Sequence, residues 1–137
     1  MPISGVIKMP GDKSISHRSL MVASLAKGKS TIKNLSSCKD VMTTNTCLKH
    51  CGIDSTIKNN IAMINGGSIM EPKDSLDCGN SGTTIRLLSG LLAGQGINAN
   101  FIGDKSLSNR PMDRIIKPLE KMGVIIKSNN GKLPFSQ

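Results

Sequence analysis

The sequence contains no tryptophan, no tyrosine and only two phenylalanines among its 137 residues. Proteins that bind single-stranded nucleic acid stack the bases on aromatic side chains, and this chain lacks the usual means of doing so. No apolar run approaches the roughly 20 residues that a membrane-spanning helix needs. The sequence therefore predicts neither a nucleic-acid partner nor a membrane partner.

Features of a targeting segment are also absent from the N-terminal residues. They have no charged start, apolar block and small-residue cleavage site, and no arginine- and serine-rich pattern of a transit peptide. We therefore expect a cytoplasmic protein. Its four cysteines form no C-x-x-C pair, and Cys47, His50 and Cys51 on one predicted helix lack a fourth zinc ligand. Buried free thiols without a metal are the expected state.

Acidic residues are few: 9 Asp and Glu stand against 18 Lys and Arg, which gives a net charge of +9. A surplus of this size attracts anionic partners. The lysines are scattered along the chain and do not form a stripe, which is unlike a nucleic-acid surface. The few basic residues inside motifs are therefore better candidates for binding an anion than the scattered lysines.

Apolar periodicity predicts an α/β protein in which one order of elements occurs twice. We interpret the repeat as two βαβαββ units, at about 10–66 and about 76–137. The predicted elements of the first copy are a strand at 3–9, a helix from about Ser16 that stops before Gly28, a strand at 30–35, a helix capped by Asp40, and a strand pair at 53–58 and 61–65 that turns at Asn59-Asn60. Those of the second copy are a strand end and helix within 76–96, a strand at 97–103, a helix at 114–123, and a strand pair at 124–128 and 131–135.

The stretch GDKSISHR, residues 11–18, marks a possible anion site at the start of the first helix. Ser14 or Ser16 as a helix cap explains the serines. It does not explain Lys13, because a cation is disfavoured at a helix N-terminus unless an anion binds there. Arg18 lies four residues after Ser14, so both face one side of the helix. His17 reads as a surface or structural residue without an assigned role.

Two further stretches have the same character. In DCGNSGTTIR, residues 77–86, the glycines allow backbone N–H groups to approach a ligand and Asn80 adds an amide, although a tight turn explains the glycines equally well. Arg86 lies one turn into the following helix. In GDKSLSNRPM, residues 103–112, Arg110 is held extended by Pro111. The sequence Gly28-Lys29-Ser30 is not a P-loop, because it follows a helix and lacks the first glycine.

Taken together, PGDKSISHRSLM, LDCGNSGTTIRLLSGLLAG and GDKSLSNRPMDRIIKPLEKMG resemble, in order and spacing, the N-terminal part of the EPSP synthases (3-phosphoshikimate 1-carboxyvinyltransferases), which are enolpyruvyl transferases. The resemblance implies the enolpyruvyl transferase-like fold, which has six βαβαββ units in two domains. Two units would be present here and the second domain absent. It also implies a monomeric full-length protein that needs no metal or organic cofactor.

The resemblance assigns roles to individual residues. Lys13 matches the lysine that touches both substrates, and it is the one catalytic candidate. Ser14 and Arg18 match residues that bind shikimate-3-phosphate together with Lys13. The residues that match contacts to phosphoenolpyruvate are Lys13, Asn80, Gly82 and Arg110.

The family reaction transfers the enolpyruvyl group of phosphoenolpyruvate to the 5-hydroxyl of shikimate-3-phosphate and releases phosphate. It belongs to the shikimate pathway of chorismate and aromatic amino-acid biosynthesis. Much of the catalytic machinery of the family lies in the other domain, beyond the matched region. We therefore expect the isolated chain to bind substrates weakly and to turn over undetectably.

Three alternatives remain. The first is a non-catalytic, anion-binding remnant of this fold. The second is the sister family that transfers enolpyruvyl to UDP-N-acetylglucosamine, but it has Asn where this chain has Ser14, and a reactive Cys that GDKSLSNRP lacks. The third is a basic nucleic-acid binder, which salt-dependent affinity for DNA would support.

Overall fold

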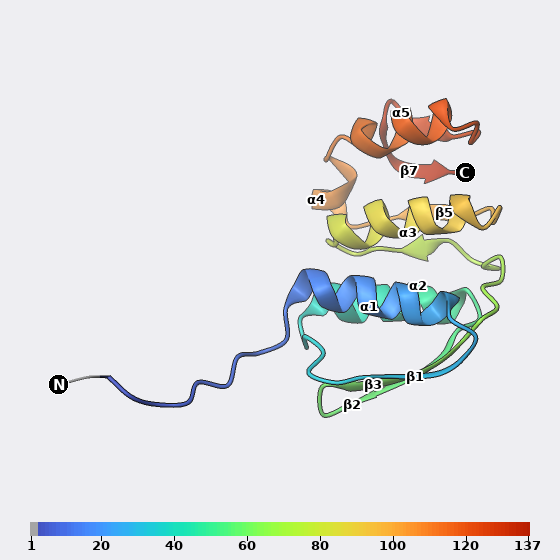
Figure 1. Cartoon of the computed structure of the whole chain (residues 1–137). Coiled ribbons are helices and arrows are strands. Elements are labelled where there is room, and N and C mark those ends of the chain that lie inside the picture. Colours follow the sequence, from blue (N-terminus) through green and yellow to red (C-terminus); the bar gives the residue numbers. More distant parts are fainter. Residues whose placement is uncertain (1–2) are drawn as a thin grey trace.

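The computed structural model describes residues 3–137 and consists of helices packed on and between two sheets (Figure 1). The first unit contains α1 (Lys13–Leu25), β1 (Gly28–Ile32), α2 (Lys39–His50), β2 (Asp54–Lys58) and β3 (Ile61–Gly66). Its three strands form an antiparallel sheet in the order β1-β3-β2. Helices α1 and α2 pack on each other, and α1 lies against β3.

The second unit repeats the order of the first unit and adds β4 before it and α4 within it. Its elements are β4 (Leu76–Asp77), α3 (Gly82–Gly94), β5 (Asn100–Ile102), α4 (Lys105–Ser108), α5 (Asp113–Lys121), β6 (Lys127–Asn129) and β7 (Lys132–Ser136). The strand order β4-β5-β7-β6 places β5, β7 and β6 as β1, β3 and β2 are placed in the first sheet. Strand β4 adds a parallel partner to β5. The repeated α/β architecture is confirmed, and α4 is an element that the sequence did not predict.

The predicted strand at 3–9 is wrong. None of residues 3–12 lies in a strand, and Figure 1 shows this dark-blue segment leading away from the body of the protein. Its apolar side chains are exposed: Ile3, Val6, Ile7 and Met9. Apolar alternation produces a strand only where a neighbouring strand pairs with it and a core covers one face, and no described element does either here.

The core forms where the two units meet through their helices. Leu20 of α1, Val41 and Leu48 of α2, and Leu88 and Leu92 of α3 are fully or almost fully buried. Strand β3 alternates, with Ala62 and Ile64 turned inward and Met63 exposed. In the second sheet, Phe101 packs on Phe135 with ring centroids 5.0 Å apart.

Local turn chemistry fits the sequence at the first hairpin. Asn59 and Asn60 have φ values of 51° and 59°, a left-handed conformation that asparagine tolerates and that two-residue hairpin loops require. The predicted turn at these residues is confirmed. Among residues 3–137, no helix has the length and apolar character that crossing a membrane demands.

Candidate active site

The first turn of α1 presents Lys13 and Ser14 to solvent. Asp12 is the N-cap: its Oδ1 accepts a hydrogen bond from the backbone N–H of Ile15 at 2.7 Å. Ser16 is buried, donates to the main-chain oxygen of Asp12 at 2.6 Å, and accepts from the backbone N–H of Ser36 at 2.9 Å. The predictions that Ser14 or Ser16 caps the helix, and that the helix begins near Ser16, are therefore wrong. Because Asp12 caps the helix, the Ser14 hydroxyl is not needed as a cap, and it makes no hydrogen bond within residues 3–137.

Lys13 forms an ion pair with Asp40 near the start of α2. The hydrogen bond to Asp40 raises the pKa of the Lys13 ammonium, so the side chain remains a cation at neutral pH. The prediction that Asp40 caps α2 is wrong, because the N-cap is Cys38 and Asp40 lies inside the first turn. Its carboxylate is used to orient Lys13 instead.

Arg18 lies one turn further along α1. Its Nη1 donates to the main-chain oxygen of Ser14 at 3.1 Å, and both residues are exposed. The predicted proximity of Ser14 and Arg18 is thus observed. A hydroxyl and a guanidinium that share one exposed surface suit a phosphate or carboxylate group.

The first turn of α3 brings two guanidinium groups to a glycine. Ser81 caps this helix by accepting from the backbone N–H of Thr84 at 3.1 Å, and Gly82 is the first helical residue. A Cβ placed on Gly82 would lie 3.3 Å from Nη1 of Arg110 and 3.9 Å from Cζ of Arg86. The absence of a side chain at Gly82 therefore allows both guanidinium groups to lie close to the first turn of the helix.

A polar network fixes Arg110 in this position. Asn80 Oδ1 accepts from Nη2 of Arg110 at 2.7 Å, while Asn80 Nδ2 donates to the two carboxylate oxygens of Asp104 at 3.1 and 2.9 Å. The backbone N–H of Leu107, followed by Asn80, lowers the pKa of Asp104, so this carboxylate stays charged. Asn80 therefore orients Arg110 and is itself held by Asp104.

Asp40 joins the two groups of predicted site residues. Its carboxylate pairs with Lys13 of α1, and its main-chain oxygen accepts from Thr84 Oγ1 of α3 at 3.2 Å. The first turns of three helices therefore meet at one residue. Figure 1 shows that α1, α3 and α4 all begin on the same side of the protein, at the left. We call this side of the protein, with Lys13, Arg18, Arg86 and Arg110, the anion surface, because the N-terminal ends of α1 and α3 and these side chains are positively charged and attract anions.

Sequence reasoning missed three residues of this surface. Arg86 lies one turn after Gly82 on the same face of the helix, and this spacing was the signal for it. The motifs alone did not assign Arg86 to the site. Asp40 and Asp104 gave no usable signal. Their partners Lys13 and Asn80 lie 27 and 24 residues away, and the fold alone brings them together.

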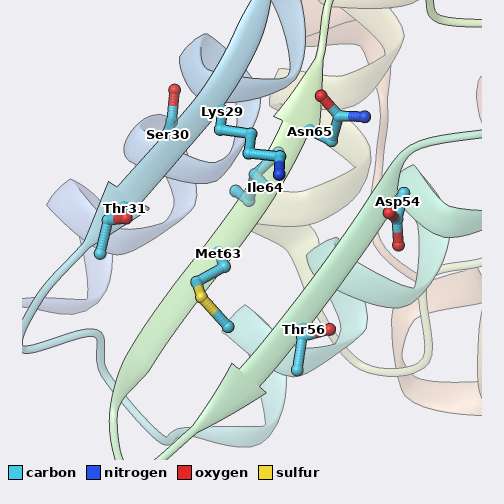
Figure 2. A pocket seen from close by; sticks show the side chains of 8 residues that line it. All are labelled: Lys29, Ser30, Thr31, Asp54, Thr56, Met63, Ile64 and Asn65. Atoms are coloured by element: carbon cyan, nitrogen blue, oxygen red, sulfur yellow. The ribbon is translucent and has the colours of Figure 1, made fainter.

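Other parts of the protein contain none of the predicted binding motifs in a position to act together. A shallow hollow lies on the outer face of the first sheet, between Lys29, Asp54 and Met63 (Figure 2), and it contains none of the predicted site residues. Gly28-Lys29-Ser30 lies in β1, not before a helix, so the rejection of a P-loop is confirmed. All four cysteines are free thiols; Cys47, Cys51 and Cys78 are buried as predicted, whereas Cys38 is only partly buried. Across residues 3–137, no three His, Cys, Asp or Glu side chains gather into a metal-binding group.

His17 is fully buried, which decides between the surface and structural readings of this residue. Burial, followed by the charge of Lys13, lowers its pKa below the ordinary 6.5. The unfolded chain therefore binds a proton near pH 6.5 that the folded chain does not bind, so acid favours unfolding.

We expect the free energy of unfolding to decrease as the pH falls below 6.5, by at most about 1.4 kcal/mol per pH unit for this one proton. His17→Asn removes the titrating group and is expected to flatten that part of the curve. Denaturant unfolding at a series of pH values between 7.5 and 5 measures both proteins. Parallel curves for the two would show that His17 is not the linked group.

Comparison with known proteins agrees with this architecture. A family model described as EPSP synthase (3-phosphoshikimate 1-carboxyvinyltransferase) matches residues 1–136. A 3-phosphoshikimate 1-carboxyvinyltransferase from Ruthia magnifica subsp. Calyptogena magnifica is 47% identical over 136 residues, covering 97% of this chain and 31% of that protein. A protein of the same name from Streptococcus mutans is 48% identical over 127 residues, covering 90% of this chain and 30% of that protein.

A solved structure shows the same similarity in three dimensions. EPSP synthase from Acinetobacter baumannii superposes with a TM-score of 0.89 at 38% identity, over 96% of this chain and 31% of that one. The chain thus spans about a third of the length of the relatives it matches. With a family match over nearly every residue and the same fold, the chain belongs to the EPSP synthase family.

Proposed function

We propose that the chain forms one wall of an enolpyruvyl transfer site. Shikimate-3-phosphate would bind at Lys13, Ser14 and Arg18 of α1. Phosphoenolpyruvate would bind at Lys13, Asn80, Gly82 and Arg110, between α1 and α3. The single observation that carries this proposal is the junction at Asp40, which joins the first turns of α1 and α3 and orients Lys13.

The reaction needs two polyanions to approach each other. A proton adds to the vinyl carbon of phosphoenolpyruvate, and the 5-hydroxyl of shikimate-3-phosphate attacks the neighbouring carbon to give a tetrahedral ketal. Loss of phosphate and a proton then gives the enol ether. Protein cations that offset the mutual repulsion and hold the two substrates in reacting geometry lower the barrier.

The charge states at the site suit this role. The raised pKa of Lys13 keeps its ammonium charged, so Lys13 acts as a fixed positive charge for both anions and is a poor general base. Arg110 is already held by Asn80 before a ligand arrives, which reduces the entropy lost on binding. Lys13 is therefore the residue that we assign to the point where the two substrates meet.

The proposed activity is that of the full-length relatives, of which the chain matches about 31%. For the 137 residues alone we propose substrate binding, with turnover depending on residues outside the matched third. Anion binding without catalysis is thus the second candidate. The substrates are small metabolites, and we propose a cytoplasmic monomer without a nucleic-acid partner.

A titration with shikimate-3-phosphate tests the proposal. We expect calorimetry or amide NMR to detect binding, and we expect Lys13→Ala and Arg18→Ala each to weaken it by about 10-fold or more, because a hydrogen bond to a charged group contributes roughly 1.5–3 kcal/mol. The largest amide shifts are expected in the first turn of α1.

Matched controls separate a specific site from the general positive charge. Lys121→Ala and Arg114→Ala remove the same charges at exposed positions on α5, outside the proposed contacts to shikimate-3-phosphate, and should leave the affinity unchanged. If shikimate-3-phosphate binds but Lys13→Ala and Arg18→Ala have no larger effect than these controls, the site assignment is wrong. Affinity for DNA that shikimate-3-phosphate does not reduce would favour a nucleic-acid binder instead.

A further inference from the structure

Buried hydrogen bonds run from α1 through α2 to α3 behind the anion surface. His17 Nδ1 lies 2.7 Å from Thr44 Oγ1, and Thr44 Oγ1 lies 2.7 Å from Thr84 Oγ1. The Thr84 hydroxyl reaches Ser81 Oγ at 2.7 Å and the main-chain oxygen of Asp40 at 3.2 Å. His17, Thr44 and Thr84 are each 0% exposed. These contacts connect one side chain from each of the three helices whose first turns form the site.

The main-chain oxygen of Asp40, at the end of this series of hydrogen bonds, determines which atom donates in each of them. A main-chain carbonyl can only accept, so the hydrogen bond to Asp40 O uses the single proton of Thr84, and that proton is then not available to Thr44. Thr44 must then donate to Thr84, and His17 Nδ1 must donate to Thr44. His17 is therefore the Nδ1–H tautomer, and its Nε2 carries only a lone pair.

The surroundings of the ring agree with this assignment. Nε2 of His17 is buried without a hydrogen-bond partner in the part of the chain that the structure describes. A proton there would bury an N–H group without an acceptor, which is more costly than leaving a lone pair unused. Burial, followed by Lys13 and with a smaller effect from Arg18, also lowers the pKa of His17, while Asp40 acts in the opposite direction. The imidazole is thus neutral although it lies between two cationic residues in the sequence.

We propose that His17 is a positioning residue that couples the two halves of the anion site. Through Thr44 and Thr84, its Nδ1–H group fixes how the first turns of α2 and α3 sit relative to α1. It thereby sets the separation between Lys13, which is held by Asp40, and Gly82. The hydrogen-bond chain does not depend on the identity of the ligands, but the coupling of two substrates rests on the proposed function.

The first test needs no variant and no ligand. Long-range ¹⁵N–¹H NMR correlation of the imidazole distinguishes the two neutral tautomers from the cation. At pH 7 we expect His17 to be the Nδ1–H tautomer, whereas the exposed His50 serves as an internal reference for an unconstrained ring. An Nε2–H tautomer or an imidazolium at this pH would overturn the proposal.

The second test uses a matched pair of substitutions on α2. Thr44→Val removes the hydroxyl that joins His17 to Thr84, whereas Thr46→Val removes an exposed hydroxyl that bonds only to Met42 O of its own helix. Each protein is titrated with phosphoenolpyruvate in the presence and absence of shikimate-3-phosphate. We expect each substrate to enhance binding of the other in the wild type, and we expect Thr44→Val to reduce this enhancement about 10-fold while each substrate alone loses less than about 3-fold. Thr46→Val is expected to behave as the wild type.

A merely structural role would lower stability without this selective loss of coupling. His17→Asn, which keeps a buried N–H donor near the position of Nδ1, is expected to restore part of the coupling that His17→Leu removes. Coupling that survives intact in both Thr44→Val and His17→Leu would overturn the proposal. If the wild type binds neither substrate, the proposed function fails, and the tautomer measurement still decides whether the hydrogen-bond chain exists as described.

Discussion

Arg110→Ala is expected to weaken phosphoenolpyruvate binding by about 10- to 100-fold, which corresponds to the roughly 1.5–3 kcal/mol of a hydrogen bond between charged groups. The guanidinium lies 3.3 Å from the position that a Cβ on Gly82 would occupy, and Asn80 holds it there by a 2.7 Å hydrogen bond. The substitution removes a positive group that is already oriented before binding and leaves Arg86 as the one guanidinium described beside Gly82. Titration with phosphoenolpyruvate, followed by calorimetry or amide NMR, measures the loss.

Arg114→Ala is the matched control for this experiment, because Arg114 is exposed on α5 and makes no hydrogen bond or ion pair among the described residues. Both substitutions lower the net charge equally. Equal losses in the two variants would mean that phosphoenolpyruvate responds only to net charge, which would contradict a site at Arg110. Shikimate-3-phosphate binding to Arg110→Ala alone should change little, since its proposed contacts lie on α1.

Gly66→Ala is expected to lower the free energy of unfolding by about 3 kcal/mol or more. A Cβ at Gly66 would lie 2.1 Å from the main-chain oxygen of Ala23 and 2.6 Å from that of Ala26. These atoms belong to the backbone, so the overlap is relieved only by moving the end of β3 away from α1. For a domain whose whole stability is about 5–15 kcal/mol, such a change is large. Urea unfolding followed by circular dichroism measures it.

Gly90→Ala provides the opposite control. Gly90 is an exposed residue inside α3, and a Cβ there would meet no atom within 4 Å. Because alanine is favoured over glycine in a helix by about 1 kcal/mol, this variant should be more stable than the wild type. Destabilisation of similar size at both positions would show that close backbone packing at Gly66 is not the cause.

Local signals in the sequence predicted most of the fold. Apolar spacing identified the four longer helices, and Asn59-Asn60 identified the tight turn of the first hairpin. The segment 3–9 shows where such signals fail: its alternation satisfies the local pattern, but strand formation depends on a partner that no local pattern contains. The short helix α4 was missed because a four-residue helix leaves too little periodicity to detect.

A tetrapeptide that occurs twice in the sequence also marks part of the site, namely the starts of α1 and α4. GDKS occurs at 11–14 and at 103–106, and in both copies the aspartate caps a helix that begins at the lysine. Asp12 accepts from Ile15 N at 2.7 Å, and Asp104 accepts from Leu107 N at 2.8 Å. In the first copy the sequence indicated Ser14 or Ser16 as the cap, because serine is as common at an N-cap as aspartate. The sequence does not show which residues of different helices lie close in space, and therefore it could not predict that Asp40 meets Lys13.

The strand pairing within each unit has a consequence for how the chain folds. All strand pairs among residues 3–137 stay inside one unit, and the first sheet is complete at Gly66. During synthesis, this sheet can therefore close its hydrogen bonds before β4 has left the ribosome. The anion surface forms later, because it requires the first turn of α3 to reach Asp40. The first sheet and the anion surface are thus expected to form at different times during synthesis.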